Sequence, residues 1–192
     1  MQPKEVLLSY LERGREAMLW KLDGLSEYDV RRPMTPTGTN LLGLVKHLAS
    51  IELGYLGEVM GRPCGIPMPW FDEGQPPNAD LYATADETRE QFIELYYSAG
   101  RHTAATVAAL DLDAPGHVPW WGERGDVTLH QVLVHVIAET QRHVGQADII
   151  REYIDGAAGL LPRVDNLPDL DADGWRRHYG ELQAIAEQFR AV

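Results

Sequence analysis

The sequence predicts an all-α protein, a four-helix bundle with an additional short helix towards its C-terminal end. Four long segments repeat apolar residues every three or four positions, and stretches rich in Pro and Gly separate them. We find no strand-like alternation, internal repeat or low-complexity tract. A chain of 192 residues with 44% hydrophobic content is ample for one packed domain and short for two, so a single domain over residues 1–192 is expected.

Two of the long helices are expected in the N-terminal part of the chain. Residues 3–22 have helical spacing of their apolar positions. A polar connection over residues 25–40 contains Pro and Gly, and it ends in Thr39 and Asn40. Either side chain is a suitable N-cap for the next helix, which the apolar spacing predicts over residues 40–60.

The third long helix is expected after an extended loop. Residues 61–78 contain five prolines and several glycines, which indicates a loop. Ordered loops of this length in a compact domain are often functional. Helical periodicity returns over residues 80–110, and Thr84 or Asp86 can serve as the N-cap.

The fourth long helix is expected over residues 128–156, a segment without Pro. Asp126 or Thr128 can cap it after a second loop. A linker over residues 162–172 then leads to a last helix, which is expected over residues 174–192.

Two polar residues interrupt the apolar face of the helix expected over residues 128–156. Glu139 and His143 are one turn apart and face the same way as that apolar face. An unpaired buried carboxylate costs several kcal/mol, so Glu139 requires a partner. Carboxylate oxygens and imidazole nitrogens are ordinary ligands of divalent cations, and the pair therefore predicts a metal site. A hydrogen-bonded Glu–His pair without metal is the alternative.

His47 lies at the edge of the apolar face of the helix expected over residues 40–60. A single histidine in this position is more often a core residue with satisfied hydrogen bonds than a ligand. Packing of the two helices by their apolar faces would bring His47 towards Glu139 and His143. Two imidazoles and one carboxylate with open coordination positions are typical of a catalytic metal site rather than a structural one.

Four residues in or near the second loop and the metal helix are candidates for a substrate pocket. Trp120 and Trp121 precede the metal helix and could either cover the core or form a pocket wall. Arg124 and Arg142 could bind an anionic substrate, with ordinary surface charge as the alternative.

Three other side chains have a possible chemical role. His135, one turn before Glu139, could add a metal ligand or a hydrogen-bond donor, or lie at the rim of the site. Gln146 could hydrogen-bond a ligand or a bound water. Cys64 is the single cysteine, and no local motif supplies a base to make it a nucleophile. Motifs for a di-iron site, a Walker A loop or a dinucleotide fold are not found.

The charge of the chain restricts its partners. The formal net charge is −12 and the isoelectric point is near 4.9, which argues against nucleic acid or an anionic membrane surface as a partner. No apolar run approaches the roughly 18 residues of a membrane-spanning helix, and the first residues lack the features of a signal peptide. With a single cysteine, the chain is expected to be a cytoplasmic protein.

Three motifs carry a resemblance to a known family. They read GLVKHL at residues 43–48, VPWWGERG at residues 118–125 and ETxRHxGxxDIxRExxDG at residues 139–156. At these motifs the chain resembles the DinB/YfiT-like superfamily of metal-dependent helical bundles, and nearly the whole chain takes part. The similarity is to the thiol-dependent branch, which includes mycothiol-dependent maleylpyruvate isomerase and related thiol S-transferases.

The resemblance implies a bundle, often dimeric, that binds one divalent metal, most often zinc or nickel. The ligand triad of the superfamily corresponds to His47, Glu139 and His143, with Glu139 replacing the middle histidine that is common elsewhere. It also implies a low-molecular-weight thiol as cosubstrate and transfer of that thiol to an electrophilic small molecule. A metal-dependent hydrolase and a non-enzymatic metal-binding stress protein are the alternatives.

Overall fold

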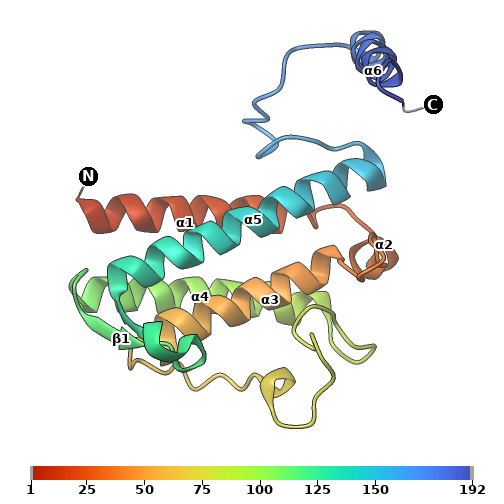
Figure 1. Ribbon diagram of the computed structural model, residues 1–192. Helices are drawn as coiled ribbons and strands as arrows, with labels where there is room; N and C mark the ends of the chain where they lie inside the picture. The colour runs from red at the N-terminus through yellow and green to blue at the C-terminus, as the bar shows by residue number, and fades with distance from the viewer. Residues whose placement is uncertain (1, 191–192) are drawn as a thin grey trace.

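The computed structural model describes residues 2–190 and confirms the all-α prediction. Four long helices form the bundle, and they run along the positions that the apolar periodicity predicts (Figure 1). Their bounds are Pro3–Trp20 for α1, Leu41–Leu53 for α3, Arg89–Ala109 for α4 and Leu129–Asp155 for α5.

The bundle has two layers. Helix α1 packs against α5 and α3 packs against α4, and Figure 1 shows the α1–α5 pair lying over the α3–α4 pair. The apolar faces of all four helices meet between these layers, in two clusters of buried side chains. Helix α3 also contacts α5, and the candidate functional residues lie along this α3–α5 contact.

Polar N-caps set where the helices begin. The side chain of Asn40 accepts a hydrogen bond from the Gly43 amide at the start of α3, and Thr128 caps α5 in the same manner. Helix α4 differs from the prediction, because it begins at Arg89 rather than at residue 80. Thr88 and Gln91 form a capping box there, so residues 80–88 belong to the preceding loop.

Helix α3 continues directly into a π-helical turn, η1, over Gly54–Glu58. Together these two elements account for most of the helix predicted over residues 40–60. A π turn widens the helix locally, and such turns are frequent at functional sites.

Several short elements lie inside segments predicted as loops. They comprise α2 at Glu27–Arg31, the 3-10 turns η2 at Pro69–Phe71 and η3 at Pro119–Arg124, and a two-stranded antiparallel sheet of β1 at Pro115–His117 and β2 at Asp126–Thr128. Elements of three to six residues are too short to give a periodic signal, which explains why the sequence did not predict them.

The last helix, α6, covers Ala172–Glu187, close to the predicted range. The predicted end at residues 191–192 lies outside the described residues. Figure 1 shows α6 standing away from the bundle, at the end of the segment that follows α5. Its large apolar side chains, among them Tyr179, Leu182 and Ile185, are exposed. Within residues 2–190, none of the helices combines the length and apolar character needed to cross a membrane.

Candidate metal centre

Three side chains from two helices converge in the groove between α3 and α5. One ligand atom from each of His47, Glu139 and His143 lies within 4.8 Å of the others. The distance from His143 Nε2 to Glu139 Oε1 is 3.1 Å, and that from His47 Nε2 to the same oxygen is 3.7 Å. The structure therefore brings together the three residues that the sequence analysis selected as a metal triad.

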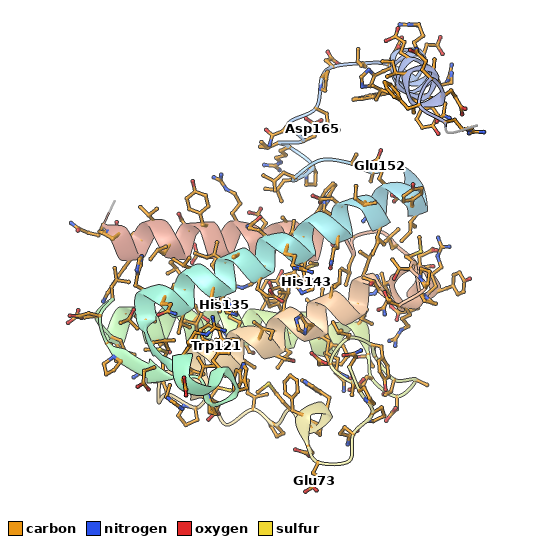
Figure 2. The ribbon with its side chains drawn as sticks, in the orientation of Figure 1. Glu73, Trp121, His135, His143, Glu152 and Asp165 are labelled. Atoms are coloured by element: carbon orange, nitrogen blue, oxygen red, sulfur yellow. The ribbon has the colours of Figure 1, made fainter. Side chains whose placement is uncertain are left out.

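The three side chains border the core and remain open on one side. The side chains of His47 and His143 are 14% and 12% exposed, while that of Glu139 is 30% exposed. Figure 2 shows His143 and His135 along the length of α5, above α3, with Trp121 beyond them. A small molecule can therefore reach the triad from solvent, which a closed structural site would not permit.

Each histidine is oriented by a hydrogen bond from its other ring nitrogen. His47 Nδ1 lies 2.6 Å from Asp80 Oδ2, and His143 Nδ1 lies 2.7 Å from Gln146 Oε1. Carboxylate and amide oxygens are acceptors, so each ring donates its Nδ1 proton to them. The Nε2 atoms of both rings then face Glu139, and that of His143 lies within hydrogen-bonding distance of its carboxylate.

The donor atoms of these three side chains indicate whether a metal fits the site. Two Nε2 atoms and a carboxylate oxygen face one another, and a divalent cation bound among them would take the place of the hydrogen bond between His143 and Glu139. A nitrogen–nitrogen–oxygen donor set on one open face is a common set for zinc and related divalent metals. The residues present therefore fit a divalent cation.

Both carboxyl groups of the site are ionised at neutral pH. Burial alone would raise the pKa of Glu139, but the positive potential and hydrogen bonding of His143 and His47 outweigh it and lower the pKa. The hydrogen bond with His47 lowers the pKa of Asp80 against a smaller opposing effect of burial. Glu139 is thus available as an anionic ligand and Asp80 as an anionic hydrogen-bond acceptor.

The loop before α4 places Asp80 beside His47. Gly43 allows this, because a side chain at that position would collide with the backbone carbonyl of Leu81. The Asn40 side chain donates to the same carbonyl, and Lys46 Nζ donates to the carbonyl of Tyr82. The sequence analysis missed Asp80 because it assigned this residue to the start of a helix, and no local pattern distinguishes it.

A polar pocket adjoins the triad near the N-terminal end of α3. Its volume is about 380 Å³, and Asn40, Leu44, His143 and Gln146 contribute to its lining. The remainder of the lining comes from the loops on either side: Thr37, Gly38, Thr39, Pro77, Asn78, Leu81 and Tyr82. Hydroxyl, amide and backbone groups form a large part of this lining, and none of its residues is Asp, Glu, Lys or Arg, so the pocket suits a polar, uncharged ligand.

An apolar pocket lies further along α3, on the other side of His47. Its volume is about 470 Å³, and its lining is formed by Ser50, Ile51, Gly54, Tyr55, Glu58, Met68, Phe71 and Trp120. The polar and apolar pockets therefore lie on either side of His47 along α3.

The other predicted pocket residues occupy different positions. Trp120 lines the apolar pocket, whereas Trp121 packs edge-on against His135 with ring centroids 4.9 Å apart. His135 lies outside the three-residue cluster and contacts aromatic rings instead. Arg124 lines a separate hollow beside the two tryptophans, and Arg142 is exposed.

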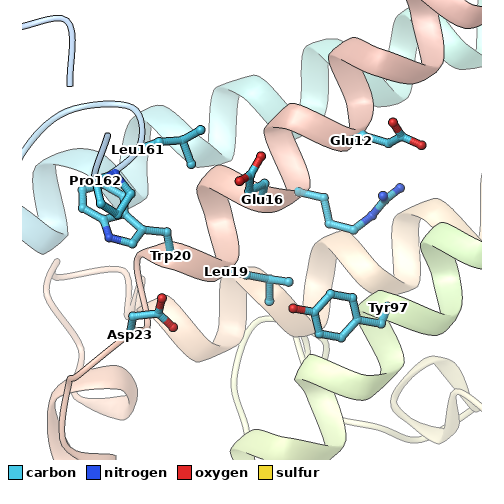
Figure 3. A pocket seen from close by; sticks show the side chains of 9 residues that line it. Glu12, Glu16, Leu19, Trp20, Asp23, Tyr97, Leu161 and Pro162 are labelled. Carbon is cyan, nitrogen blue, oxygen red and sulfur yellow. The ribbon is translucent and has the colours of Figure 1, made fainter. Parts of the chain in front are cut away.

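A further hollow lies on α1, away from the triad. Its volume is about 360 Å³, and Figure 3 shows Glu12, Glu16 and Asp23 at its edge, with Trp20 and Tyr97 beside them. None of the residues predicted for the functional site lines it. The chemistry of the triad is therefore not expected at this hollow.

Comparison with known proteins gives one family and one fold. A family model described as Mycothiol-S-transferase matches residues 6–156. The crystal structure of a conserved protein from Enterococcus faecalis superposes with a TM-score of 0.63 at 17% identity, covering 82% of this chain and 99% of that one. At this identity the likeness concerns the fold alone. None of the curated proteins matches the chain.

Proposed function

Because the chain belongs to the mycothiol S-transferase family, we propose that it transfers a low-molecular-weight thiol to electrophilic small molecules. This family membership agrees with the resemblance inferred from the motifs. In the proposal, His47, Glu139 and His143 hold one divalent metal, zinc or nickel. The observation that carries it is the open triad of two imidazoles and one carboxylate between two pockets.

Each residue of the site has a distinct part in this chemistry. A bound divalent metal would favour the thiolate form of a thiol near neutral pH. His47 and His143 bind through Nε2, and Asp80 and Gln146 hold the two rings in that orientation. The thiol proton passes to solvent, which reaches the groove beside the partly exposed Glu139.

The transfer step forms one bond and breaks another. The thiolate sulfur donates an electron pair to an electrophilic carbon and forms a sulfur–carbon bond. In a substitution, the leaving group departs from that carbon with its bonding electron pair. The charge of the sulfur thus passes to the leaving group, and the step requires no oxidant or reductant.

The polar pocket is the part of the groove that suits the thiol. His143 and Gln146 contribute to its lining, so a thiol bound there lies beside the triad. Its amide, hydroxyl and backbone groups can bind a polar, uncharged cosubstrate by hydrogen bonds. A metal-dependent hydrolase would use the same three donors, so activity measurements must separate these two functions.

The triad is tested by the metal content of purified protein. His143→Ala removes one of three proposed ligands and should abolish stoichiometric zinc or nickel binding, as measured by inductively coupled plasma mass spectrometry. His130→Ala is the matched control, because His130 is an exposed histidine on the same helix. Equal metal content in the wild type and His143→Ala would contradict the proposal.

The transferase activity is tested with the metal-loaded protein and a panel of thiols. Conjugation of mycothiol, bacillithiol, glutathione or cysteine to a chloronitroaromatic electrophile should be faster than the uncatalysed reaction. His47→Ala should lose this activity and retain the helical circular dichroism spectrum. If none of the four thiols is conjugated, thiol transfer is wrong, and hydrolysis or simple metal binding becomes the leading function.

A further inference from the structure

The apolar pocket has exposed aromatic walls that the bundle itself does not require. Phe71 is 55% exposed and Trp120 is 61% exposed, yet both line the same hollow with Ile51 and Met68. Large apolar groups on a protein surface are commonly parts of binding sites when they gather around one concavity.

Two hydrogen bonds fix these walls to the bundle. Trp120 Nε1 donates to the hydroxyl of Tyr55 at 3.1 Å, and this bond holds the loop that carries η3. Trp70 Nε1 donates to Ser50 Oγ at 3.0 Å, and it holds the neighbouring Phe71 in the long loop after η1. The pocket is therefore formed before any ligand binds, with two loops anchored to α3 and η1.

The π turn η1 opens the floor of the pocket. Gly54 lies on this turn, and a Cβ atom added there would have no heavy atom within 4 Å. The space above Gly54 is thus free for a ligand, and a Cβ atom introduced there meets no neighbouring heavy atom.

The pocket begins one helical turn along α3 from His47, a proposed metal ligand. Ser50 and Ile51 follow His47 by one helical turn and lie on the same side of α3. On the facing helix, the ring of His135 lies 4.8 Å from that of Tyr55, one turn before Glu139. A molecule in the apolar pocket and one in the polar pocket would therefore lie on either side of His47 along α3.

The charge of the pocket restricts what it can hold. The lining residues all belong to the described part of the chain. Glu58 is the only acidic residue among them, and the lining contains no Lys or Arg. Arg124 belongs to a different hollow and Arg142 is exposed, so neither supplies a positive charge to this lining. An anionic substrate would lose hydration here without gaining a cationic side chain among the lining residues.

We infer that this pocket binds the electrophile, and that the electrophile is a neutral, apolar molecule with a flat ring. The inference rests on the proposed thiol transfer. It departs from the expectation that Arg124 and Arg142 bind an anionic substrate. Thiolate attack on such a ring forms a sulfur–carbon bond, while a halide departs with its bonding electron pair.

Binding is tested without any chemical step. Dinitrobenzene, which has no leaving group, is titrated into the metal-loaded full chain by isothermal titration calorimetry, and dinitrobenzoate provides its anionic counterpart. We expect dinitrobenzene to bind at least tenfold more tightly than dinitrobenzoate. Equal or tighter binding of dinitrobenzoate would overturn the inference.

The location of the dinitrobenzene site is tested by filling the apolar pocket with a larger side chain. Gly54→Leu should weaken dinitrobenzene binding at least tenfold and leave the metal content unchanged. Gly180→Leu is the matched control, because Gly180 is also helical and has open space around it, but it lies on α6. If Gly54→Leu does not fold by circular dichroism, Phe71→Ser provides the second test, with at least a threefold loss expected. Wild-type affinity in a folded variant would place the ligand elsewhere.

The effect of the Glu58 charge on ligand binding is tested with Glu58→Gln, which preserves the shape of the side chain. Glu58 is exposed, so solvent screens its repulsion of a bound anion. The repulsion should therefore weaken the affinity for dinitrobenzoate only roughly fivefold. Dinitrobenzoate should gain about that factor and dinitrobenzene should not change. No gain for the anion would contradict the role of Glu58.

The binding test and the transfer assay fail independently. Tight dinitrobenzene binding, together with no conjugation of the chloronitroaromatic electrophile, would refute thiol transfer and leave the pocket assigned to a neutral aromatic ligand. Conjugation of anionic electrophiles at the rate of neutral ones would support thiol transfer and refute the inferred electrophile class.

Discussion

Asp80 and Gln146 determine how the two histidines of the triad present their nitrogens. Each accepts a hydrogen bond from Nδ1, so the rings cannot turn away without losing it. Partners of this kind fix the ring tautomer and raise the basicity of the ligating nitrogen. The affinity of the site for metal should therefore depend on side chains that do not touch the metal.

Asp80→Asn should weaken metal binding about 10- to 100-fold without unfolding the protein. The amide retains the size of the side chain but loses the negative charge that polarises the His47 ring. Competition with a chromogenic chelator measures the affinity. Asp72→Asn, an exposed position in the same long loop, is the control and should bind metal as the wild type does. Unchanged affinity in Asp80→Asn would mean that the ring needs no such partner.

The triad residues themselves could be predicted from sequence, whereas Asp80 could not. Glu139 and His143 interrupt an apolar face of a long helix, which is a local pattern. Asp80 acquires its position because Gly43 and Lys46 hold the loop against α3. These contacts join residues about 40 positions apart, so only the folded chain reveals them.

Buried charge connects the helices of the bundle. Arg15 on α1 forms an ion pair with Glu52 on α3, and Glu52 is 1% exposed. Burial raises the pKa of Glu52 despite the nearby guanidinium. The pair is thus costly to desolvate, and each member depends on the other.

Glu52→Ala should lower the free energy of unfolding by about 3–5 kcal/mol, because it leaves the Arg15 charge buried and unpaired. Arg15→Met combined with Glu52→Leu should recover most of this loss. Urea denaturation followed by circular dichroism measures both. A double variant as unstable as Glu52→Ala would show that the loss comes from altered packing rather than from the unpaired charge.

A second ion pair, at the end of α5, makes the stability of the fold depend on pH. Arg151 binds Asp155 and also donates to the carbonyls of Trp20 and Lys21 at the end of α1. The hydrogen bond with Arg151 lowers the pKa of Asp155. The carboxylate therefore stabilises the fold above its ordinary pKa near 3.8, and this contribution disappears as the pH falls through the lower folded-state pKa.

The stability difference between the wild type and Asp155→Asn should be largest at neutral pH and vanish in acid. Because the Asp155 side chain is 36% exposed, the difference at pH 7 should not exceed about 1 kcal/mol. Urea denaturation at a series of pH values measures it. A difference that persists unchanged below pH 3 would assign the effect to something other than ionisation.

Helices of a dozen residues or more could be predicted from the spacing of their apolar residues, whereas shorter elements could not. The predicted start of the third long helix was wrong, because Thr84 and Asp86 offer caps as good as Thr88 when judged locally. The capping box with Gln91 selects Thr88, and the loop before it is held by contacts with α3. The π turn η1 has no sequence signature of its own.

At the scale of the whole molecule, the bundle and α6 differ in how they are held. The family match ends at residue 156, and the segment that follows still contacts the core through Leu160 and Leu161. Helix α6 lies beyond that contact and exposes its apolar side. Homodimerisation and a single domain over the full length stay predictions, which light scattering and limited proteolysis can address.

Truncation after residue 170 should leave the bundle folded, with a melting temperature within about 2 °C of the full chain. The reason is that α6 buries little of its own surface, so its removal exposes little core. Differential scanning calorimetry measures the change. A large drop in melting temperature would show that α6 packs on the bundle in solution.

The positions of the triad residues in the sequence determine when each of them leaves the ribosome. His47 and Glu139 are about 90 residues apart, and translation at about 5–20 residues per second separates them by roughly 5–20 s. During that interval α3 can pair with α4, but α1 still lacks α5. The apolar face of α1 that packs against α5 is then uncovered, and chaperones can bind it. The three side chains of the proposed metal site can therefore come together only after α5 has been synthesised.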